Sequence, residues 1–456
     1  MTAPLRRKLF IAAAVSVAAL LAQSTVVFKP GTPRPAPPGD VRDIESLTTP
    51  PPGFTMQRRN NFYKIGDPSM SLYRWASSGH WSNYDESVAN VGPLPDVLTL
   101  ANGKRVTDAK TWTEQRRPEI IKLYETEIYG KVPASAPKVK WSVTKTETNG
   151  ATITKEIVGQ IGDVPVPPPP APGSRGPAAI GPPVIRISLT LPANAKGGVP
   201  LILGGGGANA QAILDRGWGY GRVDTSAVQR DSADLATLQT GVIGMTLKPG
   251  QPRPPDEWGV LRAWSWAMSR AMDYLETDPQ VDAKQVAITG HSRFGKMVLI
   301  TAALDPRFAM VFPTCAGEMG TSLSRHDWGE TIDDMVQLFA PHFAGNFVKY
   351  AGDWNKLPVD AHMLIALVAP RPVFITGGTT DQWSDPKGEF MAAAAAGPVY
   401  KLLGKKDLGA TEMPAPDAPL VDGDIAFNEH TGGHLVTPTE WQLFLKFADR
   451  YFHAKS

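Results

Sequence analysis

A serine with flanking glycines lies in the stretch GHSRFGK, between an apolar run and a segment with helical patterning. Gly290 precedes Ser292 by two residues, and Gly295 follows it by three. A strand, a sharp turn and a helix in this order expose a serine hydroxyl at the turn, and the glycines leave room where the backbone is crowded. The second glycine is one residue beyond the Gly-x-Ser-x-Gly spacing, so the prediction rests on the strand, sharp turn and helix around the serine. This setting indicates that Ser292 is a nucleophile, with an ordinary turn residue as the alternative.

A serine hydroxyl needs a base within hydrogen-bond reach, and the base needs an acid to orient it. In hydrolases with such a turn, the acid follows the serine and the histidine comes last. Among the eight histidines, His326, His342 and His362 fall too early for this last place, whereas His430 and His434 lie just before a final helix. We prefer His434 because the Gly432–Gly433 pair before it can form a tight loop, and His430 remains the alternative.

The acid is expected in a loop after an apolar strand. Asp381 follows the run RPVFITGG, whereas Asp385 precedes a proline and equally suits a turn. Ester hydrolysis also requires donors for the developing oxyanion, and the backbone N–H of Arg293 is one candidate. A second donor could come from the glycine-rich run at 201–209, although these glycines could also serve tight packing.

The elements that would position these residues alternate along the chain. Short apolar runs (VPLILGGGG, GVIGMTL, QVAITG, RPVFITGG) alternate with helical patterns (LRAWSWAMSRAMDYLETD, the segment after Ser292, EWQLFLKFADRYF). This alternation predicts a mostly parallel sheet with helices on both faces. Upstream, the spacing of apolar residues predicts a helix within 112–133, and Asn149-Gly150 predicts the turn of a β-hairpin.

The string GHSRFGK resembles the Gly-x-Ser-Arg-x-Gly-Lys turn of the glucuronoyl esterases. The stretches GPLPDVLTLANGKRVTDAKTW, LPVDAHMLIALVAPRPVFITGGTTDQW and GGHLVTPTEWQLFLKFADRYF are also similar to bacterial members, so the resemblance covers about residues 90 to 455. It implies an α/β-hydrolase fold, a three-layer sandwich with a mostly parallel central sheet flanked by helices. It also implies a secreted serine carboxylester hydrolase that cleaves esters of the glucuronic acid side groups of xylan through an acyl-enzyme.

The resemblance assigns further roles. The side chain of Arg293 would face the oxyanion, Lys296 and Glu330 would bind sugar hydroxyls, and Trp383 would line the same pocket. Simpler alternatives are a solvated or salt-bridged arginine, a surface lysine, an acid at a helix N-terminus and a core tryptophan.

One feature departs from the family pattern. Many members carry a glutamate in the loop soon after the nucleophile, and Cys315 occupies that place here. Glu318 in the same loop is therefore an alternative to Asp381 as the orienting acid.

Two other functions fit the same residues. An acetyl or other carbohydrate esterase could use the same fold, and a non-catalytic glycan-binding protein could retain it. No cofactor is expected. No metal is expected either, because the histidines are scattered and the glycine pair between His430 and His434 argues against a helix that would align them.

The N-terminus predicts export. Residues 1–24 combine basic residues with a short apolar run, which indicates a signal peptide, with an uncleaved anchor as the alternative. We expect a Pro-rich lead-in at 25–84 and a catalytic domain at 85–456 with a Pro-rich surface insertion at 162–183. The expected location is periplasmic or extracellular, without stable membrane insertion after cleavage.

Composition narrows the partners. The formal charge of +2 comes from mixed acids and bases, which gives no electrostatic case for nucleic acid or an anionic membrane. The single cysteine excludes an internal disulfide. The expected partner is a glucuronoxylan or lignin–carbohydrate ester substrate, and the expected form is a monomer.

Overall fold

The computed structural model describes residues 56–59, 62–65, 72–73, 86, 89, 92–168, 181–351 and 354–454. The predicted signal peptide and most of the predicted lead-in lie outside the described residues. Within the lead-in, three short antiparallel strands form a small sheet: β1 (Met56–Arg59), β2 (Phe62–Ile65) and β3 (Leu72–Tyr73).

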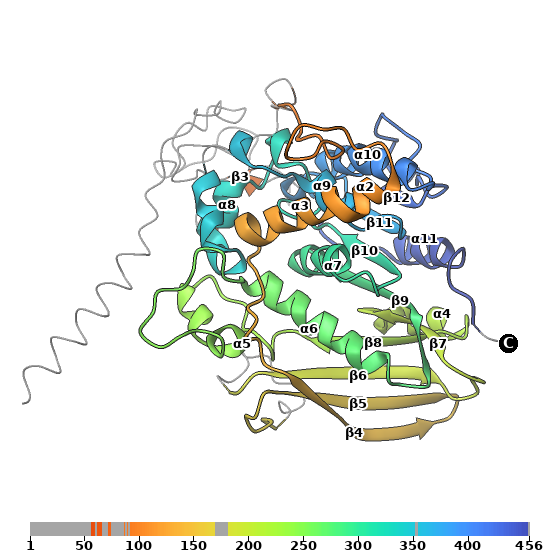
Figure 1. Cartoon of the computed structure of the whole chain (residues 1–456). Helices are drawn as coiled ribbons and strands as arrows, with labels where there is room; N and C mark the ends of the chain where they lie inside the picture. Colours follow the sequence, from red (N-terminus) through yellow and green to blue (C-terminus); the bar gives the residue numbers. More distant parts are fainter. Residues whose placement is uncertain are drawn as a thin grey trace, which may run out of the picture.

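A nine-stranded sheet with the order β12-β11-β10-β9-β7-β8-β6-β5-β4 forms the centre of the molecule (Figure 1). All neighbours from β8 to β12 pair in parallel, and β4, β5 and β6 add antiparallel strands at one edge. Its strands are β4 (Val139–Asn149), β5 (Thr152–Ile161), β6 (Val184–Pro192), β7 (Val199–Leu203), β8 (Gly219–Asp224), β9 (Val281–His291), β10 (Met310–Thr314), β11 (Val373–Gly378) and β12 (Ile425–His430). The predicted mostly parallel sheet is confirmed.

The predicted hairpin is also confirmed, because β4 and β5 pair in antiparallel around Gly150, which has a positive φ of 59°. Strand β5 ends at Ile161 and β6 begins at Val184. The described residues of the predicted insertion, 162–168 and 181–183, contain no strand, and 169–180 lie outside the described residues. Prolines in this segment remove the backbone donors that a ladder requires.

Helices cover both faces of the sheet, which gives the predicted three layers (Figure 1). Along β7, Leu201 and Leu203 belong to one hydrophobic cluster and Ile202 to another, as the two-residue period of a strand requires. The larger cluster includes residues of α6 (Val260–Leu275), α7 (Arg293–Leu304), α9 (Ala361–Ala366) and α10 (Pro386–Leu402). The smaller cluster includes residues of α4 (Ala210–Leu214) and α11 (Pro438–Ala448).

The predicted helix near 112–133 begins and ends earlier. It consists of α2 (Ala109–Thr111), the π-helical η2 (Trp112–Arg116), α3 (Arg117–Leu123) and the π-helical η3 (Tyr124–Ile128). A further helix among the described residues is α8 (Ile332–Leu338), and the 3₁₀ segments there are η4 (Gly207–Asn209), η5 (Leu235–Gln239), η6 (Ser324–His326), η7 (Ala340–His342), η8 (Gly345–Tyr350), η9 (Trp354–Lys356) and η10 (Gln382–Ser384). No helix in the described ranges is long and apolar enough to cross a bilayer.

One predicted strand is wrong. The run GVIGMTL contains the short helix α5 (Gly241–Gly244) and pairs with no strand. A short apolar run does not distinguish a buried helical turn from a buried strand, because both hide all their side chains. Here Gly241 has a positive φ of 61°, and both Val242 and Ile243 are buried.

Phe312 on β10 tests the smaller cluster, since its ring stacks on Phe444 and Phe374 at centroid distances of 4.4 and 5.2 Å. We expect Phe312→Ala to lower the free energy of unfolding by about 3–5 kcal/mol, from lost burial and the cavity left behind. Urea denaturation followed by fluorescence measures this loss. Phe312→Leu is the control and should cost less, because it retains most of the buried volume. A loss below about 1 kcal/mol for the alanine variant would contradict this packing.

Candidate active site

Ser292 is the single residue between β9 and α7, and its backbone is strained. Its φ of 59° and ψ of −128° lie in a region that residues with a side chain rarely adopt. A Cβ on Gly290 would lie 2.3 Å from the carbonyl oxygen of Phe294, and one on Gly295 would lie 3.0 Å from Cβ of Ala316. Both glycines are therefore needed where the strand and helix meet this sharply, which is the setting that the sequence predicted.

Parallel register brings four loops to one edge of the sheet. His291 at the end of β9 is level with Thr314 at the end of β10, and Gly378 of β11 is level with His430 of β12. The carboxyl ends of parallel strands share one edge, where α/β folds bind their ligands. The residues that follow these ends in the chain are therefore neighbours: Ser292, Cys315, Asp381 and His434.

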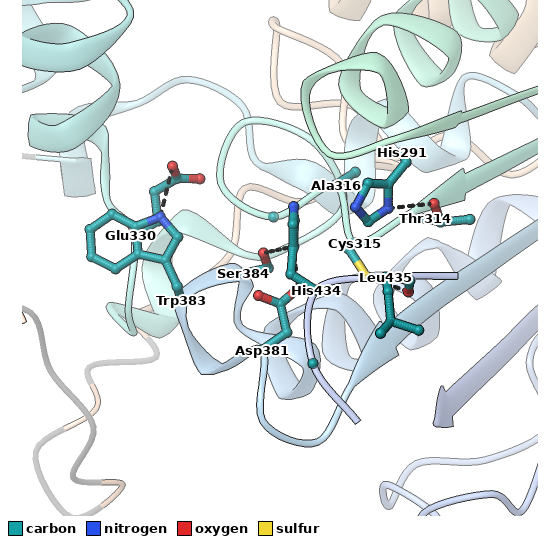
Figure 2. A network of polar contacts seen from close by, with 12 residues as sticks. His291, Thr314, Cys315, Ala316, Glu330, Asp381, Trp383, Ser384, His434 and Leu435 are labelled. Atoms are coloured by element: carbon teal, nitrogen blue, oxygen red, sulfur yellow. Dashed lines mark hydrogen bonds and ion pairs between the residues drawn. The ribbon is translucent and has the colours of Figure 1, made fainter. Parts of the chain in front are cut away.

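His434 is held by the loop after β11. Its Nδ1 is 2.7 Å from Oδ2 of Asp381 and 3.5 Å from Oγ of Ser384, as Figure 2 shows. Asp381 is buried, whereas the His434 side chain is 43% exposed. The His434 ring also contacts the ring of His291, next to Ser292, with 4.4 Å between centroids. This geometry leaves Nε2 of His434 available for chemistry.

Within the described part of the chain, the Ser292 hydroxyl forms no hydrogen bond. Catalytic hydrogen bonds are often long without substrate and shorten in the reacting complex. The contact of His291 with His434 places the predicted base beside the turn that carries the serine.

The alternative histidine has different contacts. His430 is buried, with Nδ1 2.8 Å from Oε1 of Glu440 and Nε2 3.0 Å from the carbonyl oxygen of Gly433. Burial lowers its pKa, but the hydrogen bond and charge of Glu440 outweigh this, so that the pKa of His430 is raised overall. Both ring nitrogens are engaged, and His430 ties the loop that carries His434 to the start of α11.

The alternative acids also lie elsewhere. Glu318 is buried and accepts a hydrogen bond from Oγ of Ser324 at 2.5 Å, and burial raises its pKa well above the usual range. Asp385 caps α10 and contacts Nδ1 of His326 at 2.9 Å. The structure therefore brings Asp381 to His434, and it brings neither Glu318 nor Asp385 there.

Cys315 lies directly beside this pair, at the place where many family members carry a glutamate. It is buried, has a positive φ of 46°, and its Sγ is 3.6 Å from the carbonyl oxygen of Leu435 (Figure 2). Burial raises the pKa of its thiol well above the usual value, and the nearby charge of Asp381 adds to this.

Arg293 is the first residue of α7, so its backbone N–H lacks an acceptor within the helix. The structure shows the salt bridge that was the alternative for its side chain, with Nη1 2.7 Å from Oδ2 of Asp231. Asp231 also lies 2.8 Å from Nε2 of His342. The guanidinium group packs over the ring of Phe339, with 5.1 Å to the centroid.

The glycine-rich loop after β7 lies next to the end of β9. A Cβ on Gly204 would lie 2.2 Å from the carbonyl oxygen of Thr289, and Gly204, Gly206 and Gly207 all have positive φ. The glycines permit this close approach, and the loop therefore lies near the serine turn. A second backbone donor for the oxyanion is expected there.

The three residues predicted to bind sugar form one network. Nζ of Lys296 lies 2.7 Å from the carbonyl oxygen of Ala316 and 3.3 Å from Oε2 of Glu330. Nε1 of Trp383 donates to the other carboxylate oxygen of Glu330 at 3.1 Å, which Figure 2 shows. Lys296 is buried, so it is not a surface charge, and Glu330 precedes the capping box of α8 that Thr331 and Asp334 form.

Sequence reasoning missed three residues around the site. Asp231 lies in a loop with no motif, and no pattern in the sequence gives a role to His291, although it precedes Ser292 directly. Burial and the neighbouring His434 lower the pKa of His291 to about 4, so it is neutral at pH 7. Glu389 on α10 is fully buried and accepts hydrogen bonds from the backbone N–H of Gly317 at 3.0 Å and from Oγ of Thr321 at 2.5 Å.

The order of the strands defines an α/β-hydrolase. Its serine turn follows β9, and its histidine and aspartate follow β12 and β11, which is the residue set of a serine esterase. Residues 184–404 match the family described as fungal glucuronyl esterase. Carbohydrate esterase MZ0003, from an unknown prokaryotic organism, is 34% identical over 81% of this chain and 92% of its own length.

A solved glucuronoyl esterase from Solibacter usitatus has a TM-score of 0.72 and 35% identity over 80% of this chain and 99% of its own. The 4-O-methyl-glucuronoyl methylesterase 1 of Wolfiporia cocos is 28% identical over 69% of this chain and 73% of its own length. The chain belongs to the glucuronoyl esterase family, as the resemblance in its sequence predicted, and is a carboxylic ester hydrolase.

Glu389 provides a test of the buried support beneath the site. Burial raises its pKa to about 8, so the folded protein binds a proton that the unfolded chain releases between about pH 4.5 and 8. The stability that this proton contributes is present at low pH and is lost as the pH rises through this window. We expect Glu389→Gln, which keeps the acceptor oxygen and cannot ionise, to lose less stability than the wild type between pH 5 and 9.

Thermal unfolding at a series of pH values measures this difference. Glu412→Gln, an exposed substitution, serves as the control and should follow the wild type. Parallel pH profiles for the wild type and Glu389→Gln would contradict the buried, protonated carboxyl.

Proposed function

We propose that this protein is an exported serine esterase that hydrolyses esters of the glucuronic acid side groups of xylan. The observation that carries the catalytic assignment is the strained Ser292 turn beside the hydrogen-bonded His434–Asp381 pair. A nucleophile, a base and an orienting acid are the groups that acyl transfer requires. Three separate loops at one sheet edge supply them.

The reaction proceeds in two halves. Oγ of Ser292 attacks the ester carbonyl while Nε2 of His434 takes its proton, and Asp381 stabilises the resulting imidazolium through Nδ1. The backbone N–H of Arg293 and the side chain of the same residue stabilise the oxyanion, the latter after it turns from Asp231. His434 then protonates the leaving alcohol. Water attacks the acyl-enzyme by the same route and releases the acid.

The sugar assignment rests on Lys296, Glu330 and Trp383. A glucuronate ester offers several hydroxyls and one apolar ring face, so its pocket needs directed polar groups and a flat apolar surface. The buried Lys296–Glu330 pair has fixed donors and acceptors, and the half-buried indole of Trp383 is oriented by its bond to Glu330. The relative from Wolfiporia cocos is named for 4-O-methyl-glucuronoyl esters, which agrees with such a substrate.

Export rests on the sequence of residues 1–24, with its basic residues, apolar run and small residues. We infer a periplasmic or extracellular enzyme, where polymeric xylan is accessible.

Asp381 and Glu318 are separated by matched amide substitutions. We expect Asp381→Asn to lower kcat for benzyl glucuronate by about 10³- to 10⁴-fold, because an amide cannot hold the imidazole in its productive tautomer. Glu318→Gln should change kcat by less than about tenfold, since Glu318 contacts Ser324 instead. Steady-state kinetics on both variants, with circular dichroism to verify folding, give the answer. Equal activity of Asp381→Asn and the wild type would exclude Asp381 as the orienting acid.

Lys296 distinguishes a glucuronate esterase from an acetyl esterase. Hydrogen bonds to a charged group contribute about 1.5–3 kcal/mol, so Lys296→Met should lower kcat/KM for benzyl glucuronate by about 10- to 150-fold. Hydrolysis of p-nitrophenyl acetate should change little, because an acetyl group offers no hydroxyl to this pocket. A similar loss for both substrates would contradict the sugar-binding role.

Ser292→Ala is the reference variant for both substrates. Loss of glucuronate ester hydrolysis in this variant is the expected result. Wild-type activity on acetyl esters alone would favour the alternative esterase. No hydrolysis of either ester by the wild type would favour a glycan-binding protein.

A further inference from the structure

The residue that departs from the family pattern lies within ligand distance of two residues of the proposed triad. Sγ of Cys315, a carboxylate oxygen of Asp381 and a ring nitrogen of His434 all lie within 4.8 Å of one another. In Figure 2, the sulfur of Cys315 lies between the side chains of the two histidines, His291 and His434, and the backbone of Leu435. A thiol, a carboxylate and an imidazole together are the donor types that bind Zn²⁺. A family member with glutamate at this place would lack the sulfur.

We propose that Cys315, Asp381 and His434 form an inhibitory site for thiophilic divalent cations, with Zn²⁺ as the type ligand. Its inhibitory effect rests on the proposed catalytic function, whereas metal binding does not. The site supplies three protein ligands and leaves the fourth tetrahedral position to water, as open zinc sites do. Soft sulfur and imidazole nitrogen favour Zn²⁺ over Mg²⁺ or Ca²⁺, which prefer oxygen ligands.

The present distances require only a small rearrangement. Zinc–ligand bonds of about 2.0–2.3 Å place tetrahedral ligand atoms about 3.3–3.7 Å apart. Nδ1 of His434 and Oδ2 of Asp381 are 2.7 Å apart, so they must separate by about 0.6–1 Å. His434 is the partner that can move, since its side chain is 43% exposed while Asp381 and Cys315 are buried. The same exposure gives the cation a route from solvent.

Binding would stop catalysis through the tautomer of His434. The cation replaces the proton on Nδ1, which moves to Nε2, so the imidazole stays neutral but no longer has a lone pair facing Ser292. The Cys315 thiol releases its proton to solvent and binds as thiolate, and Asp381 exchanges its hydrogen bond for a metal bond. No oxidation or reduction occurs. The base and its orienting acid are both removed from the reaction by one ion.

The contacts of Cys315 hold its side chain close to His434. Cys315 follows β10 directly with a positive φ of 46°, which fixes its side chain in the loop. Its Sγ contacts the carbonyl oxygen of Leu435, the residue after His434. The sulfur therefore follows the histidine loop and remains near the imidazole.

Inhibition is tested with the full-length enzyme, ZnCl₂ and MgCl₂, and benzyl glucuronate as substrate. Each variant is compared with its own metal-free rate. We expect Cys315→Ala to raise the Zn²⁺ concentration for half-inhibition by at least about tenfold, because one of three ligands is lost. Ser384→Ala is the matched control, since Oγ of Ser384 lies 3.5 Å from the same Nδ1 and is not one of the ligands. It should shift half-inhibition by less than about threefold.

Binding is measured separately in the Ser292→Ala variant, which needs no activity. Calorimetry with Zn²⁺ should give one site, and Co²⁺ should produce a thiolate-to-cobalt charge-transfer absorption band. Both signals should be lost or weakened at least about tenfold in Ser292→Ala/Cys315→Ala.

The outcomes separate the two proposals. Unchanged Zn²⁺ sensitivity in Cys315→Ala, or Co²⁺ binding without the charge-transfer band, would overturn the metal site. A wild-type protein that hydrolyses no ester but shows the band would retain the metal site and remove the proposed function. Inhibition by Mg²⁺ equal to that by Zn²⁺ would also overturn the metal site, because a site with a sulfur ligand binds Zn²⁺ more tightly than Mg²⁺.

Discussion

The hydrogen bond from the backbone N–H of Ser292 to the carbonyl oxygen of Thr314, 2.9 Å long, joins the serine turn to the neighbouring strand. A non-glycine residue with φ of 59° has a conformational cost of about 1–3 kcal/mol, and the surrounding structure must hold it. The parallel ladder of β9 and β10 does so before the turn, and the buried helix α7 does so after it. The position of Ser292, the proposed nucleophile, therefore depends on the sheet, and the other site residues are placed relative to the same strand ends.

The same edge places one of the candidate acids, Asp381, beside His434. In the loop after β10, Cys315 is the residue beside His434, and Glu318 lies three residues further on with a buried partner of its own. The loop after β11 therefore supplies the carboxylate. A fold that offers two adjacent strand ends next to the histidine can take its acid from either one, because both loops reach the same imidazole.

Beneath the site lies a second set of polar groups that are almost fully buried. Lys296 and Glu330 neutralise each other, and Glu389 holds the backbone of Gly317 and the hydroxyl of Thr321. An unpaired charge at such depth would be costly. Lys296 and Glu330 limit that cost by pairing, and Glu389 limits it because burial raises its pKa and favours the uncharged carboxyl. Lys296 and Glu389 thereby both hold the loop from 315 to 322, since Lys296 donates a hydrogen bond to the carbonyl oxygen of Ala316.

Much of the fold was predictable from local sequence. The hairpin at Asn149-Gly150, the strands around VPLIL, QVAITG and VFITGG, and the helices α6, α7 and α11 follow from turn chemistry and apolar period. Strand β8 could not be predicted, because its run GYGRVD carries two glycines and charged residues, although it lies inside the sheet between β7 and β6. The glycines are required there, since a Cβ on Gly219 or Gly221 would meet Leu191 or Leu189 within about 2.6 Å.

The serine turn, the short set of histidines and acids, and the family could be predicted from residue types alone, because these depend on fixed spacing within a few positions. The folded chain was needed to show that Asp381 contacts His434, that His430 is bonded to Glu440, and that Arg293 pairs with Asp231. Those contacts join residues 10 to 62 positions apart, and they arise from strand register and loop paths that no local pattern encodes. The cluster of Cys315, Asp381 and His434 is of the same kind, since its members become neighbours only when β10, β11 and β12 end at one edge.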